Sequence, residues 1–382
     1  MIHQSDPPIL LRDVMPDLDE VTALLERTAP FTPLGGWYRP DADLDEATSP
    51  LWFQNDFVHA DLQVPGSEIF LFHQQVTQAA RDFYGATVIR PHSVYVNLMA
   101  AMERSGPAHT DNPRFQGRDR SNTPMWLLRT MLWSGLFERQ NITQATSIWW
   151  MNDVEGGAFL YWPEGPDQPP ARHQGAMANT ALVGDNHGMF HQVGPVGPFG
   201  GDPLLVTPRA ELAPAGDGAG DWAVTDRGAV VFRAPLDEIR VSVLWKADVY
   251  RDEAEERRQK AEPLSMEDVA RIFDRDFEAR GADLRFDLER LEDFGMITAV
   301  SSLYPEAVPR EKLPSIRTMA NSSPSGSQSA SATLSSNSRG APPPRDIRAR
   351  VPRRVQPMKS SDRSNSASSP SAETESLSLI HI

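Results

Sequence analysis

The sequence predicts a mainly β protein whose central part is a sandwich or barrel. Short runs rich in Val, Ile, Thr and aromatic residues follow one another, with turn residues between them, as in all-β folds. The first run, residues 87–99, alternates between apolar and polar side chains. Six further runs follow at residues 146–152, 157–162, 179–183, 189–193, 229–233 and 238–250.

Helices are predicted before this β region. Residues 17–28 carry apolar side chains at helical spacing and predict a short helix. Residues 67–84 predict a second helix, with Ser67 as its N-cap and Gly85 as its C-terminal stop. Residues 30–65 are rich in Pro, Asp and aromatic residues and show no regular pattern.

Three later segments depart from the strand pattern. Residues 124–139 are apolar and are compatible with one buried helix or with two strands. Residues 195–221 are rich in Gly, Pro and Asp, which predicts mostly loop. Residues 252–291 are heavily charged with a helical pattern, which ends near Tyr304.

These patterns predict four parts of the chain. Residues 1–86 form a helical and irregular segment that packs on the core, and residues 87–250 form the β core. Residues 251–314 form a C-terminal helical segment. Residues 315–382 are Ser-, Pro- and Arg-rich with almost no aromatic residues, so we expect a disordered tail.

Charge and composition limit the class of protein. The tail holds nine Lys and Arg against four Asp and Glu, which leaves the rest of the 382-residue chain with a net charge of −20. Such an acidic body repels phosphate backbones, so we expect no nucleic-acid partner. The chain has no cysteine, hence no disulfide or zinc–thiolate site. No signal pattern and no membrane-length apolar run occur, and we expect a cytoplasmic enzyme without a membrane partner.

One ordered set of residues is typical of a metal site. His109 and Asp111 lie two apart, so on a strand both side chains face the same side. His191 follows in a strand-like run and is the candidate third ligand. Two histidines and one carboxylate on one face of an octahedron leave three positions open, as in non-haem Fe(II) oxygenases.

Other histidines were weighed against these. His59 and Asp61 form a second His-x-Asp pair, but they precede a turn far upstream of any third ligand, so we interpret them as a surface or capping pair. His187 lies in a turn-like segment and is expected to be exposed, although its spacing from His191 also allows it to compete as a ligand. His173 is expected to face solvent.

Residues 87–250 resemble the Fe(II)- and 2-oxoglutarate-dependent oxygenase superfamily. The resemblance rests on the His109-Thr-Asp111 motif, the distal His191, and Arg240-Val-Ser242 on a long strand-like run. The Gly156-Gly157 turn that leads into an aromatic run resembles the strand between the ligands. The superfamily implies a double-stranded β-helix, or jelly-roll barrel, as the fold.

The resemblance also implies roles for residues. His109, Asp111 and His191 would bind Fe(II), and Arg240 would pair with the distal carboxylate of 2-oxoglutarate, with Ser242 adding a hydroxyl bond. The gap of 49 residues between His191 and Arg240 is longer than usual, and we attribute it to an inserted loop. Arg233 is the alternative clamp.

Tyr95 and Asn97 share one strand face and are candidates to reach the cosubstrate or substrate, although core packing explains Tyr95 equally well. The predicted activity is therefore that of a dioxygenase that consumes 2-oxoglutarate and O₂ and hydroxylates an unactivated carbon of a small molecule. The alternatives are a cupin-like metal enzyme without 2-oxoglutarate and a non-catalytic binding barrel. Arg240 and Ser242 speak against the cupin, which needs no carboxylate clamp.

Overall fold

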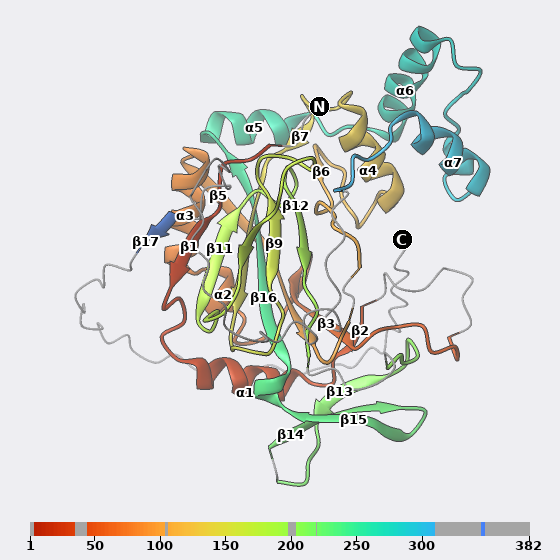
Figure 1. The fold of residues 1–382 in the computed structure, drawn as a ribbon. Coiled ribbons are helices and arrows are strands. Elements are labelled where there is room, and N and C mark those ends of the chain that lie inside the picture. Colours follow the sequence, from red (N-terminus) through yellow and green to blue (C-terminus); the bar gives the residue numbers. More distant parts are fainter. Residues whose placement is uncertain are drawn as a thin grey trace, which may run out of the picture.

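The computed structural model describes residues 4–34, 44–103, 106–197, 204–218, 220–309 and 345–347. Its central feature is a nine-stranded sheet in the order β17-β1-β11-β8-β16-β5-β3-β2, with β4 paired to β3 (Figure 1). The strands are β1 (Ile9–Arg12), β2 (Thr32–Pro33), β3 (Trp52–His59), β4 (Leu62–Gln63), β5 (Val88–Met99), β8 (Gln144–Trp150), β11 (Thr180–Gly184), β16 (Arg240–Tyr250) and β17 (Arg345–Ile347). All neighbours pair antiparallel except β1 and β17.

A smaller antiparallel sheet covers one face of the large one. It contains β9 (Phe159–Trp162), flanked by β10 (Ala171–His173) and β12 (Phe190–Val193). Buried residues of both sheets form one apolar cluster, including Trp150 and Leu244 from the large sheet and Phe159 and Tyr161 from the small one. The two sheets therefore pack face to face. This mainly β arrangement is compatible with the predicted jelly roll.

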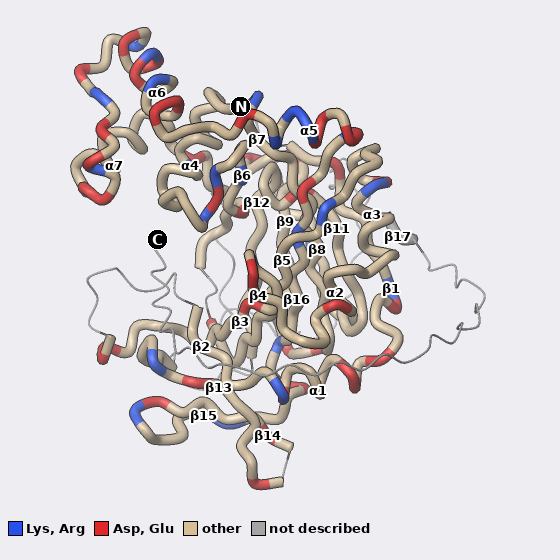
Figure 2. Tube along the Cα trace, turned by 180° about the vertical axis from the view of Figure 1, so that it is seen from behind, with Lys and Arg blue, Asp and Glu red and all other residues tan. Residues whose placement is uncertain are grey.

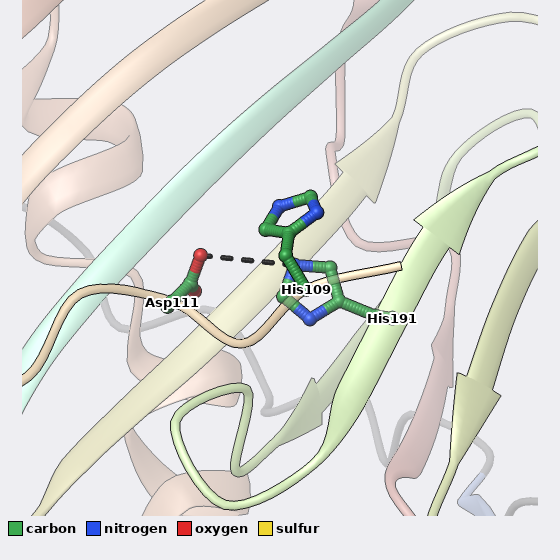
Figure 3. A group of neighbouring side chains, drawn as sticks. All are labelled: His109, Asp111 and His191. Atoms are coloured by element: carbon green, nitrogen blue, oxygen red, sulfur yellow. Dashed lines mark ion pairs between the residues drawn. The ribbon is translucent and has the colours of Figure 1, made fainter. Parts of the chain in front are cut away.

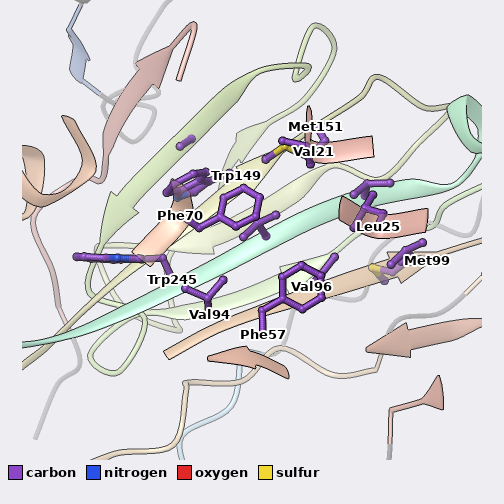
Figure 4. Close-up of a cluster of buried hydrophobic side chains, with 14 of the residues drawn as sticks. Val21, Leu25, Phe57, Phe70, Val94, Val96, Met99, Trp149, Met151 and Trp245 are labelled. Carbon is purple, nitrogen blue, oxygen red and sulfur yellow. The ribbon is translucent and has the colours of Figure 1, made fainter. Parts of the chain in front are cut away.

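Helices cover the opposite face of the large sheet. They are α1 (Leu18–Thr28), α2 (Glu68–Leu71) and α3 (Gln74–Tyr84). Figure 4 shows Leu25 of α1 and Phe70 of α2 beside Val96 and Trp149 of the sheet. Because side chains alternate along a strand, Val94 and Val96 face the helices while Tyr95 and Asn97 face the smaller sheet.

A second cluster of buried residues lies at one end of the two packed sheets (Figure 1). It joins α4 (Met125–Ser134), α6 (Met266–Arg280) and α7 (Phe294–Leu303) through a core that includes Phe137 and Phe273. The short helices α5 (Glu253–Ala261), η2 (Leu236–Glu238) and η3 (Leu288–Arg290) and the strand pair β6 (Arg114–Phe115) and β7 (Asn141–Ile142) complete the elements around the barrel. Figure 2 shows acidic and basic residues interspersed along α5 and α6, and the sheet strands bear few charges.

Most predicted elements are confirmed, and α4 resolves the open choice for residues 124–139 in favour of a helix. Helix α1 begins as predicted, with the Asp17 side chain accepting bonds from Asp19 N and Glu20 N. The single helix over residues 67–84 is wrong. It is broken after α2, Ser67 makes no side-chain cap bond, and His73 caps α3 instead; Gly85 ends α3 in the left-handed conformation, as expected.

The prediction of no regular structure for residues 30–65 is wrong, because β2, β3 and β4 lie within them. Strand β3 pairs with β5 over most of its length despite polar residues that rarely favour strands, so tertiary pairing outweighs local preference. Strand β1 was also missed. The predicted loop 195–221 contains β13 (Glu211–Pro214), which pairs with β14 (Asp221–Asp226) and, through it, with β15 (Ala229–Pro235).

The division of the chain at residues 86, 250 and 314 stays a prediction. Within the predicted tail the structure describes β17, whose backbone pairs with β1. The remainder of residues 315–382 lies outside the described residues. Among the described helices none is long and apolar enough to cross a membrane.

Candidate metal centre

The structure brings together the three predicted ligands. Nitrogen or oxygen atoms of His109, Asp111 and His191, here called the metal triad, all lie within 4.8 Å of one another. His109 and His191 face each other on adjacent antiparallel segments, which exchange backbone hydrogen bonds of 3.0 and 2.9 Å. Figure 3 shows the carboxylate of Asp111 directed toward the ring of His191. Within the part of the chain that the structure describes, the triad is the one group of this kind.

Backbone carbonyls orient both histidine rings. Nδ1 of His109 lies 3.1 Å from the carbonyl of Pro107, and Nδ1 of His191 lies 3.3 Å from that of Met189. A carbonyl can only accept, so each Nδ1 donates its proton there and each Nε2 is directed away from these carbonyls. This outer contact fixes the tautomer that a metal ligand needs.

The two oxygens of Asp111 have different surroundings. Oδ1 lies 3.7 Å from Nε2 of His191, toward the centre of the triad. Oδ2 lies 3.0 Å from Nζ of Lys246 and accepts a 3.4 Å bond from the hydroxyl of Thr146. One oxygen is thus free to bind a metal while β16 and β8 hold the other.

The protonation states suit a divalent cation. Burial alone would raise the pKa of the Asp111 carboxyl, but Lys246 and the surrounding histidines outweigh it and hold the pKa well below its usual range. Burial, aided by nearby His109, lowers the pKa of His191 to about 4. At neutral pH the triad is therefore an anionic carboxylate with a neutral, lone-pair-bearing His191, and this donor set fits Fe(II).

Arg240 lies inside the barrel without an acidic partner among the described residues. It is 2% exposed, and its Nε donates to the carbonyl of Gly157 at 3.1 Å. One terminal nitrogen donates to Ser242 Oγ at 3.0 Å, and the other has no hydrogen-bond partner. Burial lowers the pKa of Arg240 to about 9, so the guanidinium remains charged at neutral pH. An unpaired buried cation of this kind calls for an anionic ligand.

The Gly156-Gly157 turn makes room for this arginine. Both glycines have positive φ, at +75° and +65°. A Cβ on Gly156 would lie 2.2 Å from the carbonyl oxygen of Pro195, and one on Gly157 would lie 2.9 Å from Cδ of Arg240. The glycine pair is thus required by backbone conformation and by close approach.

Asn97 and Tyr95 lie on the face of β5 that is directed toward the smaller sheet. Asn97 is the cross-strand neighbour of Ser242, and its buried Oδ1 has no partner. Tyr95 pairs with Leu244, packs against the inner apolar cluster and lines a pocket beside Asp111. Both Tyr95 interpretations, packing and access to a ligand, therefore agree with its position.

Arg233 lies elsewhere. It is on the exposed strand β15, where its guanidinium pairs with Asp217 and, at 2.7 Å, with Asp221. The second His-x-Asp pair lies at the turn between β3 and β4, where Asp61 is exposed and His59 is half-buried in the wall of the pocket. His59 is no member of the triad.

Two expectations about histidines were wrong. His173 is buried and its Nε2 lies 2.9 Å from the hydroxyl of Thr180, because β10 returns it to the barrel interior. His187 is also buried, at 7% exposure; neither ring nitrogen has a hydrogen-bond partner, and Nδ1 lies 4.0 Å from Oδ1 of Asp185. The tight turn expected around it does exist, since Asp185 accepts bonds from the backbone of His187 and Gly188. Turn residues alone do not tell whether the turn faces solvent.

A pocket of about 490 Å³ opens beside Asp111. Its wall includes Tyr95, Lys246 and residues of the loop that follows the His-x-Asp motif. Lys246 was missed by the sequence analysis. The sequence does contain an indication of its role: Lys246 is a lysine in a mostly apolar strand. It lies six residues after Arg240, and an even spacing places both side chains on the same face of a strand.

Comparisons with known proteins yield similarities at the level of structure. No protein family matches the sequence, and no curated protein matches it. The solved structures it resembles include an oxidoreductase of the 2OG-Fe(II) oxygenase family from Burkholderia pseudomallei, with 14% identity, coverage of 61% of this chain and 79% of that one, and a TM-score of 0.33.

Two further examples have 9% identity. A prolyl hydroxylase from Trichoplax adhaerens, in complex with a hypoxia-inducible-factor peptide, is matched over 67% of this chain and 86% of that one, with a TM-score of 0.32. HygX from Streptomyces hygroscopicus, with nickel, 2-oxoglutarate and hygromycin B bound, is matched over 63% and 82%, with a TM-score of 0.33. At such low identities and TM-scores, we base the function on this chain's own residues.

Proposed function

We propose that this chain is an Fe(II)- and 2-oxoglutarate-dependent dioxygenase. The observation that carries the proposal is the pairing, inside one barrel, of the metal triad with a buried guanidinium that has no acidic partner in the described parts of the chain. A metal site alone fits many enzymes. A buried arginine without an acidic partner between the same two sheets fits a cosubstrate with a carboxylate at each end.

The proposed fold is a double-stranded β-helix. Following the chain, β5 belongs to the large sheet, and the segment with His109 pairs with β12 of the small sheet. Strand β8 returns to the large sheet and β9 to the small one, and β11 and β12 repeat the alternation before β16. Such alternation between facing sheets is the pattern of a jelly roll.

The residues of this site would have three roles: binding the metal, binding the cosubstrate and orienting a metal ligand. His109, Asp111 and His191 would hold Fe(II), since one nitrogen or oxygen atom of each lies within 4.8 Å of the others. Arg240 would bind the distal carboxylate of 2-oxoglutarate, with Ser242 and Asn97 beside it. Lys246 and Thr146 would keep Asp111 oriented through its second oxygen.

Fe(II) bound there would supply the oxidative chemistry that couples decarboxylation of 2-oxoglutarate to oxidation of a substrate. The balanced reaction converts a C–H group, 2-oxoglutarate and O₂ into an alcohol, succinate and CO₂. The barrel contributes water exclusion, since the aromatic residues Trp150, Phe159 and Tyr161 of the interior are buried. The protein thus supplies position and electrostatics for chemistry that belongs to the metal and cosubstrate.

The deciding experiment measures binding of 2-oxoglutarate by calorimetry to protein loaded with Mn(II), followed by succinate formation with Fe(II) and O₂. Metal binding without 2-oxoglutarate binding would leave a cupin-like enzyme as the better explanation. Absence of both would favour a non-catalytic barrel.

A further inference from the structure

Lys246 lies in the wall of the pocket beside the metal triad. Its side chain is 13% exposed, and its Nζ lies 3.0 Å from Oδ2 of Asp111. The register between β16 and β5 shifts directly after Lys246, and His92 on β5 is left without a strand partner. Such bulges re-aim side chains near functional sites, and here Lys246, His92 and Ser93 all line the pocket.

The arginines of the pocket have carboxylate partners outside the triad. Arg114 donates to Asp248 at 2.9 and 3.0 Å and pairs with Asp119 at 3.2 Å. Arg120 pairs with Asp56 at 3.2 Å. Lys246 differs, because the carboxylate it contacts is the one that the metal would also bind.

Charge therefore becomes unbalanced when the centre is loaded, if the proposed function holds. The two carboxylates of 2-oxoglutarate would compensate Arg240 and one charge of the metal, and Asp111 would compensate the other. Lys246 then shares its ion-pair partner Asp111 with the metal, and the nearby carboxylate of Asp185 is held by the backbone N–H groups of His187 and Gly188. A largely buried, uncompensated ammonium is costly, so an anionic group that enters the pocket would be stabilised there.

Unpaired polar groups lie near the same wall. Gln144 lines the pocket, and its buried Nε2 has no hydrogen-bond partner. His187 is buried near the triad, since the backbone N–H of Asp111 donates to the carbonyl of Asn186 at 2.8 Å; its ring nitrogens make no hydrogen bond, and Nδ1 lies 4.0 Å from Oδ1 of Asp185. Gln144 therefore offers an unused N–H donor to an acceptor in the pocket.

We propose that the substrate of this enzyme carries one carboxylate, which Lys246 and Gln144 bind on the pocket side of the metal triad. This inference rests on the proposed function. One uncompensated positive charge matches a monocarboxylate better than a doubly charged phosphate, and it disfavours amines. The carboxylate would place a nearby carbon of the substrate beside the triad.

The test uses the full chain loaded with Mn(II) and 2-oxoglutarate without O₂, after binding of both has been measured. The probes are small monocarboxylates, their primary amides, the corresponding amines and phosphate monoesters of similar size. Melting temperatures identify the probes that bind, and calorimetry gives their affinities. We expect monocarboxylates to stabilise the loaded protein and the amides and amines to leave it unchanged.

Variants assign this binding to Lys246. Replacing one partner of a buried charged pair costs about 2 kcal/mol or more, so Lys246→Met should weaken binding of the tightest-binding monocarboxylate by roughly thirty-fold. Ser93→Asp places a carboxylate on the cross-strand neighbour of Lys246 and should weaken binding of the same probe. This second variant keeps the test valid if Lys246→Met folds poorly. Lys260→Met is the matched control, because Lys260 is 61% exposed on α5, where it pairs with Glu256.

Several results would overturn the inference. They are stabilisation by amides or amines rather than acids, no stabilisation by any monocarboxylate, and unchanged monocarboxylate affinity in both pocket variants. Failure of the proposed function is a separate outcome, because it appears as loss of Mn(II) or 2-oxoglutarate binding before any probe is added.

Discussion

Replacement of Arg240 tests whether this residue binds 2-oxoglutarate or only supports the fold. In the structure Arg240 is buried, makes neutral hydrogen bonds to Gly157 and Ser242, and leaves one terminal nitrogen unpaired. Removing the cationic partner of a buried carboxylate costs about 2–5 kcal/mol. At about 1.4 kcal/mol for each factor of ten, Arg240→Ala should weaken 2-oxoglutarate binding at least roughly thirty-fold.

Stability should respond in the opposite way. A buried, unpaired charge is itself destabilising, and replacing it with an apolar side chain of similar length is often neutral or stabilising. Arg240→Met should therefore leave the free energy of unfolding of the ligand-free protein nearly unchanged. A structural arginine would behave differently, with a large loss of stability and normal binding of 2-oxoglutarate.

The assay is calorimetric titration of Mn(II)-loaded protein with 2-oxoglutarate, together with urea unfolding of the free protein. Arg240→Lys should recover part of the affinity, since it keeps the charge without the planar fork. Metal content should stay at the wild-type level in all Arg240 variants. Arg233→Ala is the control, because its ion pairs with Asp217 and Asp221 lie on the surface, where solvent screens them. If Arg233→Ala abolished binding and Arg240→Ala did not, the assignment would be reversed.

Four further predictions follow from the structure. Alanine at any position of the metal triad should remove about one bound Mn(II) per chain, with little change in circular dichroism. His59→Ala should keep the bound Mn(II). Loss of Mn(II) in His59→Ala with retention in His109→Ala would assign the metal to the other His-x-Asp pair. Burial lowers the pKa of His173 to about 4, so the unfolded chain binds the extra proton first and stability should fall as pH decreases from about 6.5 toward 4. The loss from this group is up to about 3 kcal/mol, and His173→Gln should reduce the fall of the urea midpoint over this window, while His187 and His191, whose pKa values burial also lowers, keep part of the fall; equal pH dependence in both proteins would contradict it. Gly157→Ala should lower stability and 2-oxoglutarate affinity together, whereas Gly281→Ala, with a similar φ of +66° and open space around it, should change stability alone, by about 1 kcal/mol; normal binding in Gly157→Ala would refute the steric argument. Truncation after Pro314 removes β17, the edge strand beside β1, and should still change the melting temperature and activity little, since a Ser- and Pro-rich segment buries little apolar surface; a large drop in either would show that residues 315–382 support the fold.

Strand alternation made the candidate site readable from the sequence. His109 and Asp111 are two apart, as are Arg240 and Ser242, and each pair shares a face in any extended backbone. The Gly156-Gly157 turn was also predictable, because a glycine pair before an apolar run indicates a backbone conformation that other residues rarely adopt. These features depend on neighbours in the chain, so no tertiary information was needed.

Burial and long-range pairing were decided by the folded chain. Strand β3 has a sequence with weak strand preference and exists because β5 pairs with it. His173 and His187 lie in turn-rich segments that fold into the interior, which local composition does not reveal. Lys246 contacts Asp111 across 135 positions of sequence, and this contact exists only after two sheets have packed face to face.

Periodicity and motif spacing are local properties, so they were enough to predict the β architecture, the three candidate metal ligands and the candidate carboxylate clamp. The folded chain was needed to show that Arg240 is buried without an acidic partner among the described residues, while Arg233 is paired on the surface. It was also needed to bring Lys246 and Gln144 into one pocket wall with Asp111. Desolvation and charge compensation depend on what surrounds a side chain in space, and residues distant in sequence supply those surroundings.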